Sequence, residues 1–179
     1  MNSTKMSSVQ IWLCLVFVCC SAQRQDYACK WMTSQYGTVN GVALSLLRQM
    51  GGKICSEIVP FPERLYKNME MSTAADQLGF MAEVVEQILN LFDHYDDAAG
   101  WDTGALDKFL HNESRQLIEL KNCAAAHPNP RRKAYKVKRH FRQLKKILRK
   151  NNYNGESWEK IRRAVLLHLT RMAVMTGHV

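Results

Sequence analysis

The sequence predicts an all-α protein, a bundle of five helices with a long connection between the first helix and the second. Five stretches repeat apolar residues every three or four positions, which is the spacing of one helix face. No stretch sustains the alternation of apolar and polar residues that indicates a strand. The first connection, residues 51–72, is the long one.

The N-terminal 22 residues have the pattern of a secretory signal peptide. Lys5 precedes an apolar run at residues 11–20, and the small residues Ser21 and Ala22 follow it. This run is too short for a bilayer, which needs about 20 residues, whereas a short run closed by small residues is typical of a cleaved signal. We therefore expect residues 1–22 to be removed and residues 23–179 to form one secreted domain.

The first helix is predicted from about Thr33 to Met50, and Gly51 and Gly52 end it, as glycines commonly do. Its expected inner stripe consists of Val39, Val42, Leu46 and Met50.

The length of the first connection favours a particular topology. Helices that run up and down a bundle need only short loops, whereas parallel first neighbours need a long crossover. Residues 51–72 are numerous enough to cross a bundle, with Pro60-Phe61-Pro62 inside them and room for one short turn at residues 63–67. The predicted fold class is therefore a long-chain helical cytokine bundle.

The second and third helices carry the widest apolar faces. The second, over about 73–92, has these inward residues: Leu78, Phe80, Met81, Val84, Val85, Ile88, Leu91 and Phe92. The third begins with Asp102 as its N-cap and stops before Pro128, because proline lacks the amide hydrogen and clashes with the preceding turn. Its inward residues are Leu106, Phe109, Leu110, Leu117 and Leu120.

The fourth helix, within residues 131–150, and the fifth, over about 156–175, are separated by a turn at 151–155. The apolar residues of the fourth are Val137, Phe141, Leu144 and Leu148. Those of the fifth are Trp158, Ile161, Val165, Leu169 and Met172.

Leu166 and Leu167 lie off the apolar stripe of the fifth helix, on the side of Arg163 and Thr170. Apolar side chains beside an arginine are favoured at protein interfaces, which makes this side a candidate contact patch. The alternative is a central helix that is buried all round.

Positive charge is concentrated in one segment. The chain carries a net charge of +9, and eleven of its 25 Lys and Arg residues lie between Arg131 and Lys150, a stretch without Asp or Glu. One interpretation is the solvated or receptor-facing outer side of a bundle helix. The other is a surface for a polyanion, which in a secreted protein means a glycosaminoglycan or an anionic membrane rather than nucleic acid.

Three cysteines remain after signal removal, namely Cys29, Cys55 and Cys123. They allow three single pairings, each of which leaves one thiol over. The Cys29–Cys123 pairing closes the longest loop and offers the largest chain-entropy gain, about 4–5 kcal/mol, but this gain alone does not decide the connectivity.

No catalytic motif is present, since the chain lacks a G-x-S-x-G elbow, an H-E-x-x-H helix and a glycine-rich phosphate loop. Asp93, Asp96 and Asp97 do not have the spacing of a calcium loop. We expect neither enzymatic activity nor a metal or other cofactor. Asn112-Glu113-Ser114 is a sequon for N-glycosylation.

Three blocks of sequence carry a family resemblance. The strongest joins residues 88–92 (ILNLF), 98–102 (AAGWD) and 106–109 (LDKF) to Cys123. The second is Trp158-Glu159 with Arg162, and the third is Pro62-Glu63. With these residues the chain resembles the type I interferons, and most of all those of bony fish.

The resemblance implies a monomeric, secreted antiviral cytokine that joins two class II cytokine receptor chains, activates JAK–STAT signalling and induces interferon-stimulated genes. It also implies the Cys29–Cys123 bridge. Mammalian alpha-type members have a second bridge, but Glu156 stands where its second cysteine would be, so Cys55 is expected to be unpaired as in the two-cysteine fish group. The alternative is a dimer linked through Cys55.

The same resemblance assigns receptor contacts. The first receptor chain would bind Arg162, Arg163 and Leu166 of the fifth helix together with the loop near Cys55, where Ser56 replaces an apolar anchor of the family. The second chain would bind the opposite face, at Leu89, Asn90 and His94.

Overall fold

The computed structural model describes residues 30–52, 57–93, 95, 97–125 and 134–177. This part of the chain is helical and contains no strand, which confirms the predicted all-α class. A helical segment at residues 30–34 precedes the named helices. These are α2 (Tyr36–Gln49), α3 (Glu63–Glu70), α4 (Ala74–Phe92), α5 (Thr103–Ala125), α6 (Ala134–Lys150) and α7 (Gly155–Met175).

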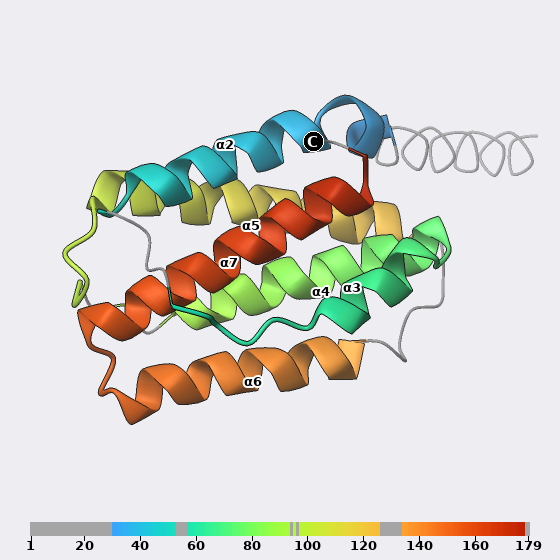
Figure 1. Cartoon of the computed structure of the whole chain (residues 1–179). Coiled ribbons are helices and arrows are strands. Elements are labelled where there is room, and N and C mark those ends of the chain that lie inside the picture. Colours follow the sequence, from blue (N-terminus) through green and yellow to red (C-terminus); the bar gives the residue numbers. More distant parts are fainter. Residues whose placement is uncertain (1–29, 53–56, 94, 96, 126–133, 178–179) are drawn as a thin grey trace, which may run out of the picture.

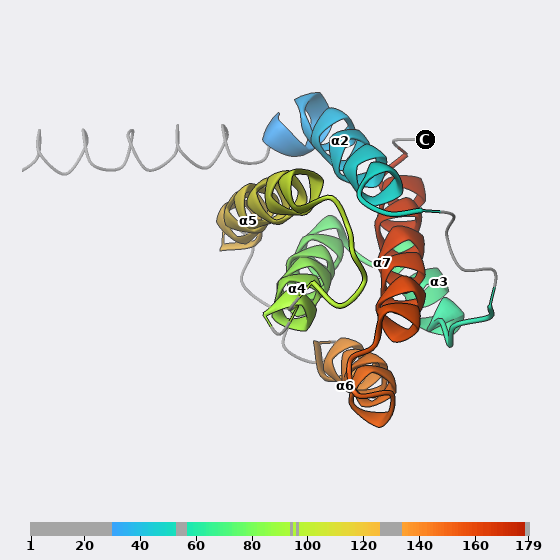
Figure 2. The same ribbon diagram turned by 90° about the vertical axis from the view of Figure 1, so that its left-hand side faces the viewer.

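The helices form an elongated bundle in which α2, α4 and α6 run in one direction while α5 and α7 run in the other (Figure 1). Seen along the bundle, α2, α5, α4, α6 and α7 follow one another around a ring, and α7 returns to α2 (Figure 2). Because α2 and α4 are parallel, their connection crosses the length of the bundle, as predicted from its length. The predicted short turn within it is the helix α3, which packs on α4 and α7.

The core contains the predicted apolar stripes of α4, α6 and α7. Val137, Phe141, Leu144 and Leu148 of α6 are all at most 2% exposed, and Trp158 of α7 is fully buried. Large aromatic side chains fill the end of the bundle where α4, α5 and α7 meet, since the Trp158 ring lies 5.8 Å from that of Phe92. The charged residues of α6 therefore all lie outside its buried stripe.

Of the predicted stripe of the first helix, Met50 is buried as predicted, but the rest is wrong by one position. The buried residues of α2 are Tyr36, Asn40, Ala43 and Leu47, whereas Val42 is 46% exposed. The physical reason is a long-range hydrogen bond, because Asn40 Nδ2 donates to the Leu169 carbonyl at 3.2 Å and so satisfies a polar side chain inside the core.

The helix starts follow local capping rules. Asp102 Oδ1 accepts from the Ala105 amide at 2.6 Å, which confirms the predicted N-cap of α5. Thr73 and Asn154 cap α4 and α7 in the same way. No helix in the described residues is both long enough and apolar enough to span a membrane.

Candidate functional site

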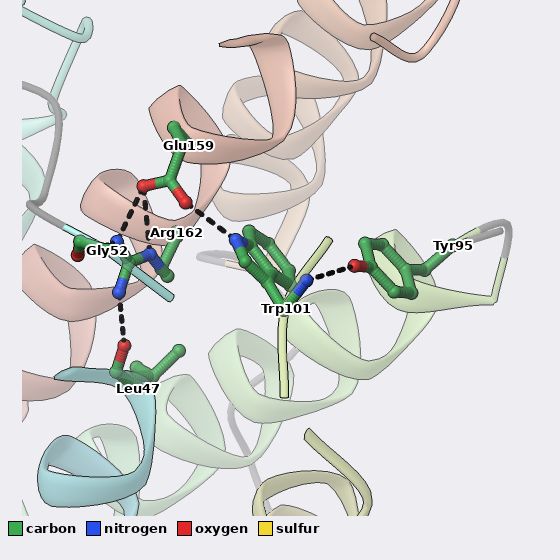
Figure 3. Close-up of polar contacts among 6 residues, drawn as sticks. All are labelled: Leu47, Gly52, Tyr95, Trp101, Glu159 and Arg162. Atoms are coloured by element: carbon green, nitrogen blue, oxygen red, sulfur yellow. Dashed lines mark hydrogen bonds and ion pairs between the residues drawn. The ribbon is translucent and has the colours of Figure 1, made fainter. Parts of the chain in front are cut away.

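The beginning of α7 is tied to the end of α2 by the buried side chain of Arg162 (Figure 3). Arg162 Nη1 donates to the Leu47 carbonyl at 2.9 Å, and Nη2 donates to the Gly52 carbonyl at 2.7 Å. Arg162 Nε and Nη2 also bond Glu159 Oε2, at 3.0 and 2.7 Å. The guanidinium thus caps the C-terminal end of α2 and holds the first residues of the crossover.

Glu159 extends this cluster to the connection between α4 and α5. Its Oε1 accepts from Trp101 Nε1 at 2.6 Å, and the Trp101 ring stacks on Tyr95 with 4.9 Å between centroids. The Tyr95 hydroxyl in turn accepts from the Trp101 amide at 3.4 Å. We call Arg162, Glu159, Trp101 and Tyr95 the arginine cluster.

Gly51 fits into this cluster because it has no side chain. A Cβ atom there would lie 2.7 Å from Trp101 Cδ1 and 2.9 Å from Arg162 Cζ, both closer than real contacts allow. Nearby, the Asp102 amide donates to the Met50 carbonyl at 2.6 Å. Residues 50–52 are therefore fixed against both α7 and the start of α5.

Ion pairs attach the rest of the crossover to α7. Lys160 Nζ lies 2.8 Å from Glu57 and 3.0 Å from Glu156, and hydrogen bonds to these two carboxylates raise the Lys160 pKa. Further along, Arg171 Nη2 lies 2.7 Å from Glu63 of α3. Two described parts of the crossover, at Glu57 and at α3, are thus held against α7.

The outer side of α7 lies between α2 and this crossover (Figure 2). Arg163, Leu166 and Leu167 are half-buried there, while Thr170 and Val174 are exposed. We call these five residues the α7 face. The two predicted alternatives are both met in part, since Leu166 packs against the core while both leucines keep part of their surface in solvent.

The residues predicted to bind the first receptor chain do not share one environment. Arg163 and Leu166 lie together on the α7 face, and Ser56 lies outside the described residues. Arg162 is buried, since its side chain is 0% exposed and its donors are engaged within the chain. In this conformation Arg162 holds the end of α2 and Gly52 beside α7.

Two of the residues predicted for the second chain, Leu89 and Asn90, belong to α4, on the other side of the bundle (Figure 2). Leu89 is half-buried and Asn90 is exposed, while His94 lies outside the described residues. Glu83 and Glu86, on the same strip of α4, pair with Lys138 of α6 at 3.5 Å and Lys121 of α5 at 2.7 Å. Asn90 therefore belongs to a strip of α4 that runs between α5 and α6.

The predicted covalent sites are placed only in part. Cys123 is buried near the end of α5, whereas Cys29 and Cys55 lie outside the described residues. Asn112 is half-buried, and its Oδ1 accepts from Gln116 Nε2 at 3.0 Å.

Sequence reasoning missed the arginine cluster. One local signal was available, since Glu159 and Arg162 stand three positions apart, a spacing that brings opposite charges together on a helix. The roles of Gly51 and Trp101 had no such local sign.

Two buried histidines lie between α6 and α7. His140 Nε2 and His168 Nε2 are 3.0 Å apart, and His168 Nδ1 is 2.6 Å from the Tyr66 hydroxyl. Burial lowers the pKa of His140 to about 4 and lowers that of His168 as well, so both rings are neutral near pH 7. A search of the described residues finds no group of three potential metal ligands. The pair is thus a packing feature between two helices.

Comparison with known proteins gives consistent matches. Residues 32–179 match the family model of the interferon alpha/beta domain. Interferon a3 of Oncorhynchus mykiss is 36% identical over 177 residues, which cover 97% of this chain and 99% of that protein. Interferon omega-2 of Equus caballus is 24% identical over 78% of this chain and 76% of that protein. The solved structure of zebrafish interferon 1 superposes with a TM-score of 0.78 at 36% identity, over 84% of this chain and 99% of that one.

Proposed function

This chain belongs to the type I interferon family, in its fish-like form, and from that premise we propose that it signals by joining two class II cytokine receptor chains. The family makes it an antiviral cytokine and not an enzyme. The proposed signal is JAK–STAT activation followed by expression of interferon-stimulated genes. The observation that carries the proposal is the α7 face, a partly apolar strip with an arginine at its edge, held beside a tethered crossover.

For the first receptor chain, we assign the contacts to Arg163 and Leu166. A half-buried leucine beside an arginine gives an apolar anchor and a charged donor, and arginine is among the residue types that dominate interface energies. Ser56 is proposed to complete this surface, since the residues near it in sequence, Gly52 and Glu57, are both bonded to α7. Arg162 is assigned as a positioning residue that holds the crossover in place.

For the second receptor chain, we assign the strip of α4 that contains Leu89 and Asn90, continued in sequence by His94. Its exposure between α5 and α6 supports this role. It lies on the other side of the bundle from the α7 face, so two receptor chains have room to bind one monomer at the same time (Figure 2).

We further propose that the mature protein is a secreted domain of residues 23–179, closed by a Cys29–Cys123 bridge and glycosylated at Asn112. The fish relative, which this chain matches over nearly its full length, supports the secreted form as a family property.

The test measures STAT phosphorylation in fish cells treated with the purified mature protein. We expect a response at nanomolar concentration or below, reduced at least about tenfold in the Arg163→Ala/Leu166→Ala variant, since a tenfold loss needs only about 1.4 kcal/mol of contact energy. The control is Arg115→Ala/Ile118→Ala, which removes an exposed arginine and a 59% exposed isoleucine from α5. Silence from a folded wild-type protein across several fish cell lines contradicts the proposal.

The other candidate is a cationic effector that acts on anionic membranes through residues 131–150. Its charge fits, but the apolar stripe of α6 is packed in the core and unavailable to enter a bilayer. Signalling through receptors is therefore the better supported function.

A further inference from the structure

We infer that α6 and the adjacent segment at α3 form a binding site for a sulfated glycosaminoglycan, separate from the α7 face. The inference rests on the proposed function only through the extracellular location of the chain. The site has two parts, a row of cations along α6 and a groove where α6 meets the crossover.

The cation row follows from the helical spacing of α6. Arg139, Arg142, Lys146 and Arg149 stand three, four and three positions apart, so they share one side of the helix, and all four are exposed. Neighbouring side chains in such a row lie about 5–6 Å apart, and the 17 residues of α6 extend for about 25 Å. A linear polyanion with regularly spaced sulfates matches a straight row of this kind.

Intramolecular acids leave this row largely uncompensated. Among the described residues of α6, one base is paired with an acid. This base is Lys138, which lies 3.5 Å from Glu83 of α4. Arg142 lies over the ring of Tyr135 at 5.9 Å, a contact that leaves its charge intact. A polyanion bound here gains by releasing its condensed counterions.

The groove supplies a more specific feature than charge alone. It has a volume of about 570 Å³ and lies between the segment 60–68 and α6. Arg64 enters it from α3, and Lys136 and Arg139 enter it from α6, together with the amides of Asn68 and Gln143. Glu63 also lines the groove, but its carboxylate is bonded to Arg171 at 2.7 Å. Three cations from two helices thus line one hollow, an arrangement that suits charge-assisted hydrogen bonds to a sulfate.

Other polyanions fit less well. The apolar stripe of α6 (Val137, Phe141, Leu144 and Leu148) is at most 2% exposed and Ile147 packs against the core, so this side has no hydrophobic wedge for a lipid bilayer. Single-stranded nucleic acid is bound on rows of aromatic platforms, whereas the exposed aromatic residue of the described α6 is Tyr135, at 61%. A sulfated glycosaminoglycan needs only spaced cations and polar groups, which is what this surface provides.

The experiment measures binding of the purified mature protein to immobilised heparan sulfate at about 150 mM salt and across a salt series. Three variants each replace three exposed basic residues by glutamine. The groove variant is Arg64→Gln/Lys136→Gln/Arg139→Gln. The row variant is Arg142→Gln/Lys146→Gln/Arg149→Gln. The control, which removes the same charge from α2 and α5, is Arg48→Gln/Lys108→Gln/Arg115→Gln.

We expect the wild type to bind heparan sulfate, and chemically desulfated chains to bind at least about tenfold more weakly. The groove and row variants should each lose about tenfold or more in affinity, with the slope of log K against log salt reduced by about two to three, whereas the control should lose little. If all three variants lose the same affinity for heparan sulfate, binding depends only on net charge, and the proposed site is wrong. Binding to phosphatidylserine vesicles without binding to heparan sulfate would also overturn it.

STAT phosphorylation by the same variants separates this inference from the proposed function. If the site is correct, the groove and row variants lose glycosaminoglycan binding but still activate STAT in cells that lack sulfated chains. A wild type that binds heparan sulfate but never activates STAT would contradict the proposed function and leave this site standing.

Discussion

At the scale of single residues, Arg162 belongs to a sequence motif of the family, yet its side chain is buried and bonds other parts of the same chain. Its guanidinium bonds the carbonyls of Leu47 and Gly52 and the carboxylate of Glu159. Removing it takes a donor from both carbonyls and from the carboxylate, which keeps its hydrogen bond to Trp101, and the buried Leu47 carbonyl left without this donor costs free energy.

We predict that Arg162→Ala lowers the free energy of unfolding by about 2–4 kcal/mol, as measured by urea denaturation. Arg163→Ala, one position further and only half-buried, is the matched variant and should lower stability clearly less than Arg162→Ala does, because part of its side chain is already in solvent. If Arg162→Ala keeps full stability yet loses signalling, Arg162 is a direct receptor contact and the positioning role is wrong.

Glu113 is a second residue whose burial has a measurable consequence. It is fully buried on α5, with Gln116 Nε2 donating to its Oε1 at 2.9 Å, and burial raises its pKa from 4.5 to about 8. The folded protein therefore holds this proton more tightly than the unfolded chain. Its stabilising contribution is complete below about pH 4.5 and is lost as the pH rises through about 8.

We predict that Glu113→Gln, which keeps the shape and cannot ionise, becomes more stable than the wild type as the pH rises from about 5 to about 8, by an amount on the order of 3 kcal/mol. Urea denaturation of both proteins at the two pH values measures this difference. A constant difference across the range would contradict a raised pKa.

At the scale of helices, the accuracy of the sequence prediction depended on how local the determining contacts were. The stripe of α6 was predicted correctly because apolar and basic residues alternate there in sharp contrast. The stripe of α2 was not, because Asn40 is buried through a hydrogen bond to Leu169 in a different helix. The burial of Arg162 likewise requires carbonyls from Leu47 and Gly52, more than a hundred positions away. Composition and periodicity carry no information about such distant partners.

The joint between α6 and α7 provides a prediction of pH dependence. The pKa of His140 in the folded protein is lowered from 6.5 to about 4, and that of His168 is lowered too. Between these pH values the unfolded chain therefore binds more protons than the folded protein. The free energy of unfolding should therefore fall as the pH drops from about 6.5 to about 4.

We predict that His140→Gln makes this acid slope shallower by about one proton. The slope of unfolding free energy against pH measures it, and His111→Gln, at an exposed position of α5, is the control and should keep the wild-type slope. An unchanged slope in His140→Gln would show that this histidine is not buried in its neutral form.

At the scale of the whole molecule, the two proposed receptor surfaces lie on different sides of the bundle. One is on α7 and the other on α4, and α6, which carries the proposed glycosaminoglycan site, lies next to both of these helices (Figure 2). This arrangement was foreseen only as a topology, from the length of the first connection. The contents of each surface required the structure.

The proposed Cys29–Cys123 bridge joins the start of the mature chain to the end of α5. We predict a disulfide-linked peptide pair containing these two residues in a non-reducing digest, and a folded, active monomer for Cys55→Ser. Reduction of the bridge should lower stability by about 2–5 kcal/mol. A linked pair that contains Cys55 instead would contradict this connectivity.

The central claim is that the outer face of α7 binds the first receptor chain. The most direct measurement is the affinity of the mature protein for purified ectodomains of fish class II cytokine receptors, for the wild type, Arg163→Ala/Leu166→Ala and Arg115→Ala/Ile118→Ala. We predict that the α7 double variant dissociates at least about tenfold faster from one receptor chain, because truncating an anchor acts mainly on the dissociation rate, while the α5 variant matches the wild type. Equal affinity of all three proteins for every receptor chain would contradict the claim.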